Sequence, residues 1–84
     1  MFWDAYTKLR ALAPRDEEVA VGVEVSVHTV RAWDLAAEKS RDVDHKRFPS
    51  YFNRQRLARF ADSLGAPKRV VEALRSDDPK EVRA

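Results

Sequence analysis

The sequence predicts an all-α fold, a small five-helix bundle that contains a helix–turn–helix. Apolar residues recur at helical spacing both before and after the middle of the chain, and the prolines fall between these segments. Only one segment, around residues 19–27, alternates between apolar and polar residues as a strand would. The length of 84 residues corresponds to one domain. We assign residues 1–75 to this domain and residues 76–84 to a flexible polar tail.

The first helix is expected over residues 2–13. Phe2, Tyr6 and Leu9 lie at i, i+4 and i+7, and either Leu12 or Ala13 continues the stripe. Pro14 then disfavours further helix.

Residues 17–33 can be interpreted in two ways. With period two they form a strand, because five valines, Val19, Val21, Val23, Val25 and Val27, are separated by single residues. With helical spacing they form two helices joined by a turn. We favour the helical interpretation, because an isolated strand pair is marginal in water and no second segment offers a partner strand.

In the helical interpretation a short helix covers residues 16–23, with Asp16 as its N-cap and Glu17 and Glu18 complementing its dipole. Val19, Ala20 and Val23 line its inner face, and Val25 fills the turn. Ser26 caps a second helix over residues 26–38, in which Val30 and Trp33 face the first helix.

Two further helices are expected in the C-terminal half. Residues 40–50 have turn composition, and a helix begins at Ser50 or Asn53 and ends at Leu64. Its apolar face consists of Leu57, Phe60, Ala61 and Leu64. Gly65 stops this helix, and Pro67 opens a fifth one with Val70, Val71 and Leu74 turned inward.

Charge is distributed unevenly along the chain. The formal net charge is +2, but residues 1–38 carry four basic and seven acidic side chains, whereas residues 39–59 carry seven basic and two acidic ones. Basic residues concentrated directly after the second helix of the turn motif would suit contacts with phosphates. The alternative is that they form an ordinary solvated surface.

Several function classes are disfavoured by composition. The chain has no cysteine and only two glycines, so it lacks a cysteine-based zinc site and a glycine-rich phosphate loop. His28 and His45 do not have the spacing of a metal site. No apolar run approaches 18 residues, and the N-terminus lacks the pattern of a signal peptide. We therefore expect that the protein is not an enzyme and that it binds no cofactor, metal, small-molecule ligand or membrane. We expect a cytoplasmic location.

The pattern of Val19-Ala20, Val25-Ser26, Thr29-Val30 and Trp33, with Leu57, Phe60-Ala61 and Leu64-Gly65 downstream, resembles the lambda-repressor/Cro-like helix–turn–helix family over about residues 5–75. The resemblance implies a five-helix DNA-binding domain that acts as a homodimer on a palindromic operator. The chain departs from the family at Glu24, where glycine is preferred, and at Asp16 and Glu17, where polar residues open the helix.

A second resemblance concerns residues 25–33, which are also similar to MerR-type and excisionase-type winged helices. In that case residues 40–52 would form a small β-wing. The full helix expected at residues 2–13 favours the repressor-like alternative.

In a helix–turn–helix the start of the second helix enters the major groove. The predicted base contacts are Ser26, Val27, His28 and Arg31, of which Arg31 suits guanine O6 and N7. The predicted phosphate contacts are Thr29, Lys39, Arg41, Lys46, Arg47, Arg54 and Arg56. The alternatives are an ion pair between Arg31 and Asp34, and an exposed His28 without a role. Trp33 is expected in the core.

The function expected from these features is a sequence-specific transcriptional regulator such as a repressor, of phage or mobile-element type, with double-stranded DNA as its ligand. A homodimer is expected, because one small domain contacts few bases. The aromatic residues Phe2, Trp3, Tyr6, Tyr51 and Phe52 exceed the needs of a small core and offer an interface. The alternatives are an excisionase-like DNA-bending protein and a protein-binding module of antitoxin or inhibitor type.

Overall fold

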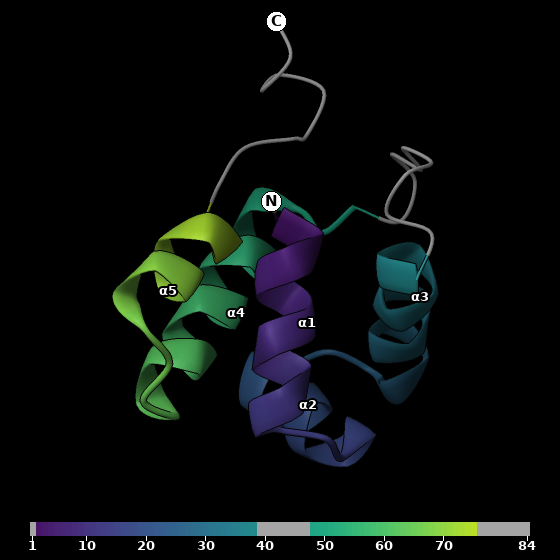
Figure 1. Ribbon diagram of the computed structural model, residues 1–84. Coiled ribbons are helices and arrows are strands. Elements are labelled where there is room, and N and C mark those ends of the chain that lie inside the picture. The colour runs from purple at the N-terminus through teal and green to yellow at the C-terminus, as the bar shows by residue number, and fades with distance from the viewer. Residues whose placement is uncertain (1, 39–47, 76–84) are drawn as a thin grey trace, which may run out of the picture.

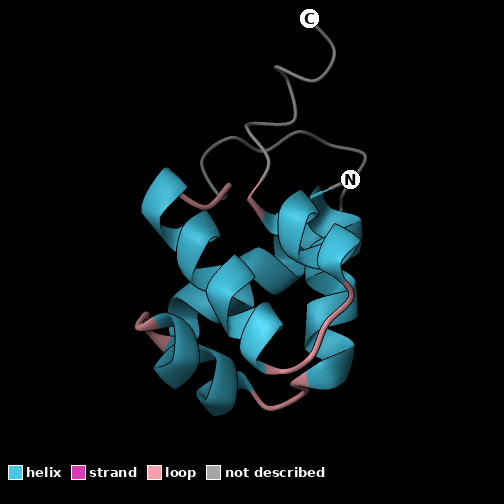
Figure 2. Cartoon of the chain, turned by 90° about the vertical axis from the view of Figure 1, so that its left-hand side faces the viewer, coloured by secondary structure: helices cyan, strands magenta, loops and turns pink. Residues whose placement is uncertain are grey.

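The computed structural model describes residues 2–38 and 48–75, and within these ranges all regular elements are helices (Figures 1 and 2). The helices are α1 (Phe2–Leu12), α2 (Asp16–Val23), α3 (Val27–Glu38), α4 (Tyr51–Ser63) and α5 (Lys68–Leu74). The all-α prediction is confirmed. The alternative β-wing would lie at residues 40–52, of which residues 40–47 lie outside the described residues. Residues 48–50 form no strand, and α4 begins at Tyr51. The predicted tail at 76–84 also lies outside the described residues.

α1 occupies the middle of the bundle, with α3 on one side, α4 and α5 on the other, and α2 below (Figure 1). It packs against α3 and α5, whereas α2 packs against α3 and α4. One core joins all five helices, and its largest fully buried side chains are Tyr6, Leu9, Val19, Val23, Val30, Leu57 and Leu74. Burial of each such apolar side chain contributes about 1.5–3 kcal/mol.

The predicted apolar stripe of α1 is confirmed, and the structure shows which of the two alternative residues continues it. Phe2, Tyr6 and Leu9 are buried, and the stripe continues to Ala13, which is fully buried, rather than to Leu12, which is 49% exposed.

The valine-rich segment forms two helices joined by a turn at residues 24–26, as favoured from the sequence. Val19 and Val23 are fully buried, whereas Val21 between them is 79% exposed. Glu24 adopts the left-handed conformation, with φ 64° and ψ 47°. The N–H of Val25 then donates to the carbonyl of Ala20 at 3.0 Å, and the Val25 side chain packs against the core. This backward bond and apolar contact are features of the Schellman motif.

The connection between α4 and α5 uses the same kind of turn. Gly65 has φ 82°, its N–H donates to Asp62 O, and the N–H of Ala66 donates to Ala61 O, each at 3.0 Å. At the other end of α4, Ser50 Oγ accepts the N–H of Asn53 at 3.3 Å. The predicted start at Ser50 and stop at Gly65 are therefore confirmed.

Gly22 sets the distance between α2 and α4. A Cβ atom at this position would lie 2.4 Å from two ring carbons of Phe60, closer than carbon atoms pack. The absence of a side chain allows the Phe60 ring to lie directly on α2, which holds the helix pair α2–α3 against α4.

Candidate functional site

α3 has one buried and one uncovered face. Val30, Trp33 and Ala36 are buried in the bundle. On the opposite side, His28 and Arg31 are exposed near the start of the helix. The predicted base-contacting residues are thus brought together at the N-terminal end of α3; Ser26 is exposed and Val27 is half-buried. We call Ser26, Val27, His28 and Arg31 the α3 face.

The first turn of α3 is fixed by a cap. Ser26 Oγ accepts the N–H of Thr29 at 3.2 Å and lies 3.1 Å from Thr29 Oγ1. The predicted cap is confirmed, and it satisfies one of the free N–H groups at the start of the helix. Both hydroxyl groups remain at the surface.

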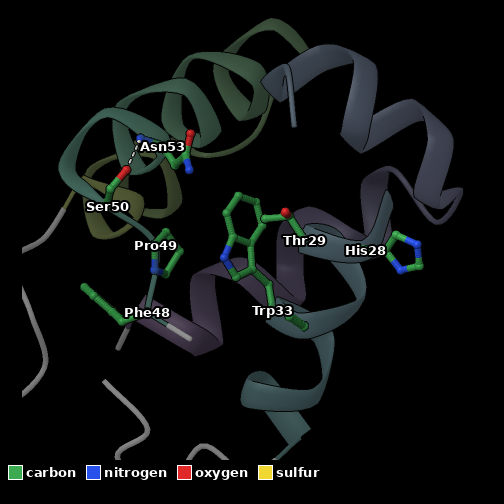
Figure 3. A pocket seen from close by; sticks show the side chains of 8 residues that line it. His28, Thr29, Trp33, Phe48, Pro49, Ser50 and Asn53 are labelled. Atoms are coloured by element: carbon green, nitrogen blue, oxygen red, sulfur yellow. Dashed lines mark hydrogen bonds between the residues drawn. The ribbon is translucent and has the colours of Figure 1, made fainter. Parts of the chain in front are cut away.

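A shallow hollow of about 340 Å³ separates the starts of α3 and α4. It is lined by His28, Thr29, Ala32, Trp33, Phe48, Pro49, Ser50 and Asn53. Figure 3 shows Thr29 and Trp33 on one side and Ser50 and Asn53 on the other, whereas the imidazole of His28 points away. Two helices therefore begin beside one hollow, and helix starts carry partial positive charge.

A polar network beneath the α3 face ties α3 to α1. The hydroxyl of Tyr6 donates to Asp34 Oδ1 at 2.7 Å, and Arg10 Nε donates to the same oxygen at 3.2 Å. Burial, and then the hydrogen bond to Asp34, raise the pKa of the Tyr6 phenol. Burial tends to lower the pKa of Arg10, but the hydrogen bond to Asp34 and the nearby negative charges outweigh it and raise that pKa.

Asp16 belongs to this network, and its prediction as an N-cap is wrong. The cap position of α2 is Arg15, which makes no side-chain cap hydrogen bond. Asp16 is the first residue of α2, and its carboxylate accepts hydrogen bonds from Arg10 Nη2 and, at 3.4 Å, from Arg31 Nε. Two guanidinium groups from distant segments bond the two oxygens of this carboxylate through charge-assisted hydrogen bonds, so the carboxylate is drawn away from the backbone of α2.

The alternative pair of Arg31 with Asp34 is not formed. Asp34 is occupied by Tyr6 and Arg10, and the Arg31 side chain, which is 62% exposed, bonds Asp16 instead.

Arg54 lies inside the protein. It is 9% exposed, its Nη1 donates to the carbonyl of Pro49 at 2.9 Å, and its guanidinium lies 5.2 Å from the ring centre of Phe48. This placement disfavours the predicted phosphate contact, because the side chain is buried and its Nη1 is already bonded to the carbonyl of Pro49. The spacing of Arg54 with Leu57, Ala58 and Ala61 on the inner stripe of α4 is the signal that indicates burial.

The other predicted phosphate-contacting residues differ in placement. Arg56 is exposed beside Arg59 in a groove that also includes Gly22 and Glu24, on the α2–α4 side of the bundle. Thr29 lies in the hollow. Lys39, Arg41, Lys46 and Arg47 lie outside the described residues. Ser50 and Asn53 were not predicted as site residues, although the sequence indicates Ser50 as the start of a helix.

Among the predicted interface aromatics, Phe2 and Tyr6 belong to the core, and Trp3 is partly buried against it. Tyr51 and Phe52 are 59% and 72% exposed at the start of α4, with their ring centres 5.9 Å apart.

Comparison with protein-family models, with curated proteins and with solved structures gave no match for this chain. Within residues 2–38 and 48–75, no group of histidine and acidic side chains is arranged to hold a metal ion. In the same part of the chain, no helix has the length and apolar character needed to cross a membrane.

Proposed function

We propose that this protein is a sequence-specific DNA-binding regulator that places the start of α3 in the major groove. The observation that carries the proposal is the geometry of the pair α2–α3. A tight turn with one left-handed residue joins the two helices. The inner side of α3 buries Val30 and Trp33, and its outer side exposes His28 and Arg31. In helix–turn–helix proteins the second helix of such a pair enters the groove with its N-terminal residues at the base edges.

The chemistry of the α3 face suits base reading. The guanidinium of Arg31 can donate two hydrogen bonds to guanine O6 and N7, and His28 can donate one. Val27 is half-buried against the core and can offer only its exposed methyl surface to the methyl group of thymine, whereas the Ser26 hydroxyl can bond a base or a phosphate.

The hollow beside the α3 face suits a backbone phosphate. The starts of α3 and α4 supply partial positive charge, and Thr29 and Asn53 supply a hydroxyl and an amide donor. The basic residues of segment 39–47 directly follow α3 in the sequence and add attraction for the DNA backbone.

We further propose that the protein acts as a homodimer in the cytoplasm. One α3 contacts too few base pairs for the affinity typical of specific sites, so a second copy is needed. The exposed rings of Tyr51 and Phe52 offer apolar area for such an interface.

Selection of bound sequences from a random DNA library, followed by binding isotherms at several salt concentrations, tests the proposal. We expect an enriched, two-fold symmetric site bound roughly a thousandfold more tightly than random DNA. We also expect affinity for both DNAs to fall as salt rises. Binding that bends DNA without sequence preference would favour the architectural alternative. Absence of DNA binding at low salt would favour a protein-binding module, for which the exposed Glu17 and Glu18 provide an acidic surface.

A further inference from the structure

Among residues 2–38 and 48–75, Arg31 is hydrogen-bonded through only one edge of its guanidinium group. Its Nε donates to Asp16 Oδ2 at 3.4 Å, while its side chain is 62% exposed. Within the described part of the chain no hydrogen bond engages Nη1 or Nη2 of Arg31. The pair of Nη groups is one edge that can donate both hydrogen bonds to guanine O6 and N7.

Asp16 is itself fixed from the interior. Arg10 Nη2 bonds Oδ1 of Asp16, and the side chains of Arg10 and Asp16 are 16% and 27% exposed. Arg10 is held in turn by Asp34 and by the carbonyl of Ala13, to which its Nη1 donates at 2.6 Å. A continuous series of hydrogen bonds therefore runs from α1 through Asp16 to the exposed guanidinium on α3.

We propose that Asp16 is a positioning residue that sets the sequence specificity of Arg31, an inference that rests on the proposed DNA-binding function. By accepting the Nε hydrogen, the carboxylate orients the guanidinium and leaves both Nη groups for guanine O6 and N7. An arginine ordered before binding loses less side-chain freedom when it meets its base.

The Arg31–Asp16 contact, unlike the partly buried Arg10–Asp16 pair, should contribute little to folding, because the Arg31 side chain is largely exposed and surface ion pairs are weak. Asp16 thus favours the correct site by ordering Arg31, whereas the repulsion between its charge and the DNA phosphates acts on every sequence alike.

The test compares Asp16→Asn with Glu17→Gln on the selected site and on random DNA. Asparagine has one acceptor oxygen in place of two, so it cannot accept from Arg10 and Arg31 as the carboxylate does. We expect Asp16→Asn to lower the ratio of specific to random affinity about tenfold, chiefly by weakening binding to the specific site. Glu17→Gln removes the same charge from the neighbouring exposed residue and should raise both affinities equally, leaving the ratio unchanged.

A double-mutant cycle isolates the route through Arg31. In an Arg31→Ala background, Asp16→Asn should no longer change the ratio. If Asp16→Asn does not fold, Arg31→Lys provides a second variant, because a substitution at this exposed position should not disturb the fold. Lysine keeps the charge but lacks the planar fork, so the ratio should fall about tenfold.

The inference is overturned if Asp16→Asn changes both affinities equally, as Glu17→Gln does, or if its effect on the ratio persists without Arg31. It is also overturned if Arg31→Lys discriminates as well as the unaltered protein. Failure of the proposed function has a different signature, since the unaltered protein would then show no preference between the two DNAs.

Discussion

The helix pairs α2–α3 and α4–α5 are joined by the same kind of turn, but their second helices differ. In both pairs a left-handed residue, Glu24 or Gly65, allows the next N–H to bond a carbonyl five residues earlier at 3.0 Å. α3 then begins with the Ser26 cap and extends for 12 residues, whereas α5 begins after Pro67 without a side-chain cap and extends for seven.

This difference shows that the turn alone does not create a recognition surface. α5 turns Val70, Val71 and Leu74 inward and serves to close the core against α1. α3 is long enough to be anchored by Val30 and Trp33 and still to present an uncovered face at its capped start.

The two helices are also anchored by different chemistry. α3 is tied to α1 by the polar contacts of Asp34 with Tyr6 and Arg10 in addition to its apolar side chains. The contacts described for α5 are apolar. Substitutions in each helix and in each turn can therefore distinguish how much the polar contacts of α3 and the apolar contacts of α5 contribute to stability.

Removal of the inner side chain of α5 should have the largest effect. Leu74 is fully buried, so Leu74→Ala should lower the free energy of unfolding by about 2–5 kcal/mol through lost burial and the cavity left behind. Leu35→Ala, on the half-exposed side of α3, is the matched control and should cost about 0.5 kcal/mol or less. Urea unfolding measures both. Equal losses would show that α3 lacks an uncovered face.

The polar anchor of α3 predicts sensitivity to alkaline pH. The pKa of Tyr6 is raised in the folded protein from the ordinary value of 10.0, so the unfolded chain loses this proton first. The contribution of Tyr6 to the free energy of unfolding should be constant below pH 10. Above pH 10 it should fall by up to about 1.4 kcal/mol per pH unit.

Unfolding measured between pH 8 and pH 11 checks this expectation. Tyr6→Phe should lower stability at pH 8, because Asp34 loses a hydrogen bond, yet should reduce the alkaline loss. An unchanged alkaline loss in Tyr6→Phe would contradict the buried hydroxyl contact.

The α4–α5 turn should depend on its glycine. A Cβ atom at Gly65 meets no atom within 4 Å, so Gly65→Ala acts through backbone conformation alone. Because alanine is strained at φ 82°, the substitution should cost about 1–2 kcal/mol in urea unfolding. No loss would contradict the left-handed conformation of this residue.

The α2–α3 turn should respond in the opposite sense and more weakly. Glu24 already occupies the left-handed region, so Glu24→Gly should relieve strain and raise stability by about 0.5–1 kcal/mol, after allowance for the greater freedom of glycine in the unfolded chain. A raised midpoint of thermal unfolding is the expected readout. A lowered midpoint would indicate that the Glu24 side chain makes a stabilising contact.

Helix positions were predictable because local signals agreed with packing. The spacing of Phe2, Tyr6 and Leu9, the cap at Ser26 and the stop at Gly65 each specify an element without reference to the rest of the chain. The valine-rich segment was ambiguous, because a spacing of four residues between Val19 and Val23 fits one face of a strand and one face of a helix alike.

The site was less predictable because its geometry depends on distant contacts. The position of Asp16 next to a helix start suggests a cap, but Arg10 and Arg31 approach it only in the folded bundle. Likewise, Asp34 lies three residues from Arg31 in the sequence, yet Tyr6 and Arg10 take its oxygens. Charge type predicts that such residues pair, and the fold selects the partners.

The central claim, that the α3 face reads bases, is tested most directly by Arg31→Ala on the selected site and on random DNA, with Arg69→Ala as control. Arg69 is an exposed arginine on α5, so the control removes the same charge away from α3. Arg31→Ala should cost about 1–3 kcal/mol on the selected site and much less on random DNA, whereas Arg69→Ala should leave the ratio of affinities unchanged. Equal losses on both DNAs for Arg31→Ala would contradict base reading by α3.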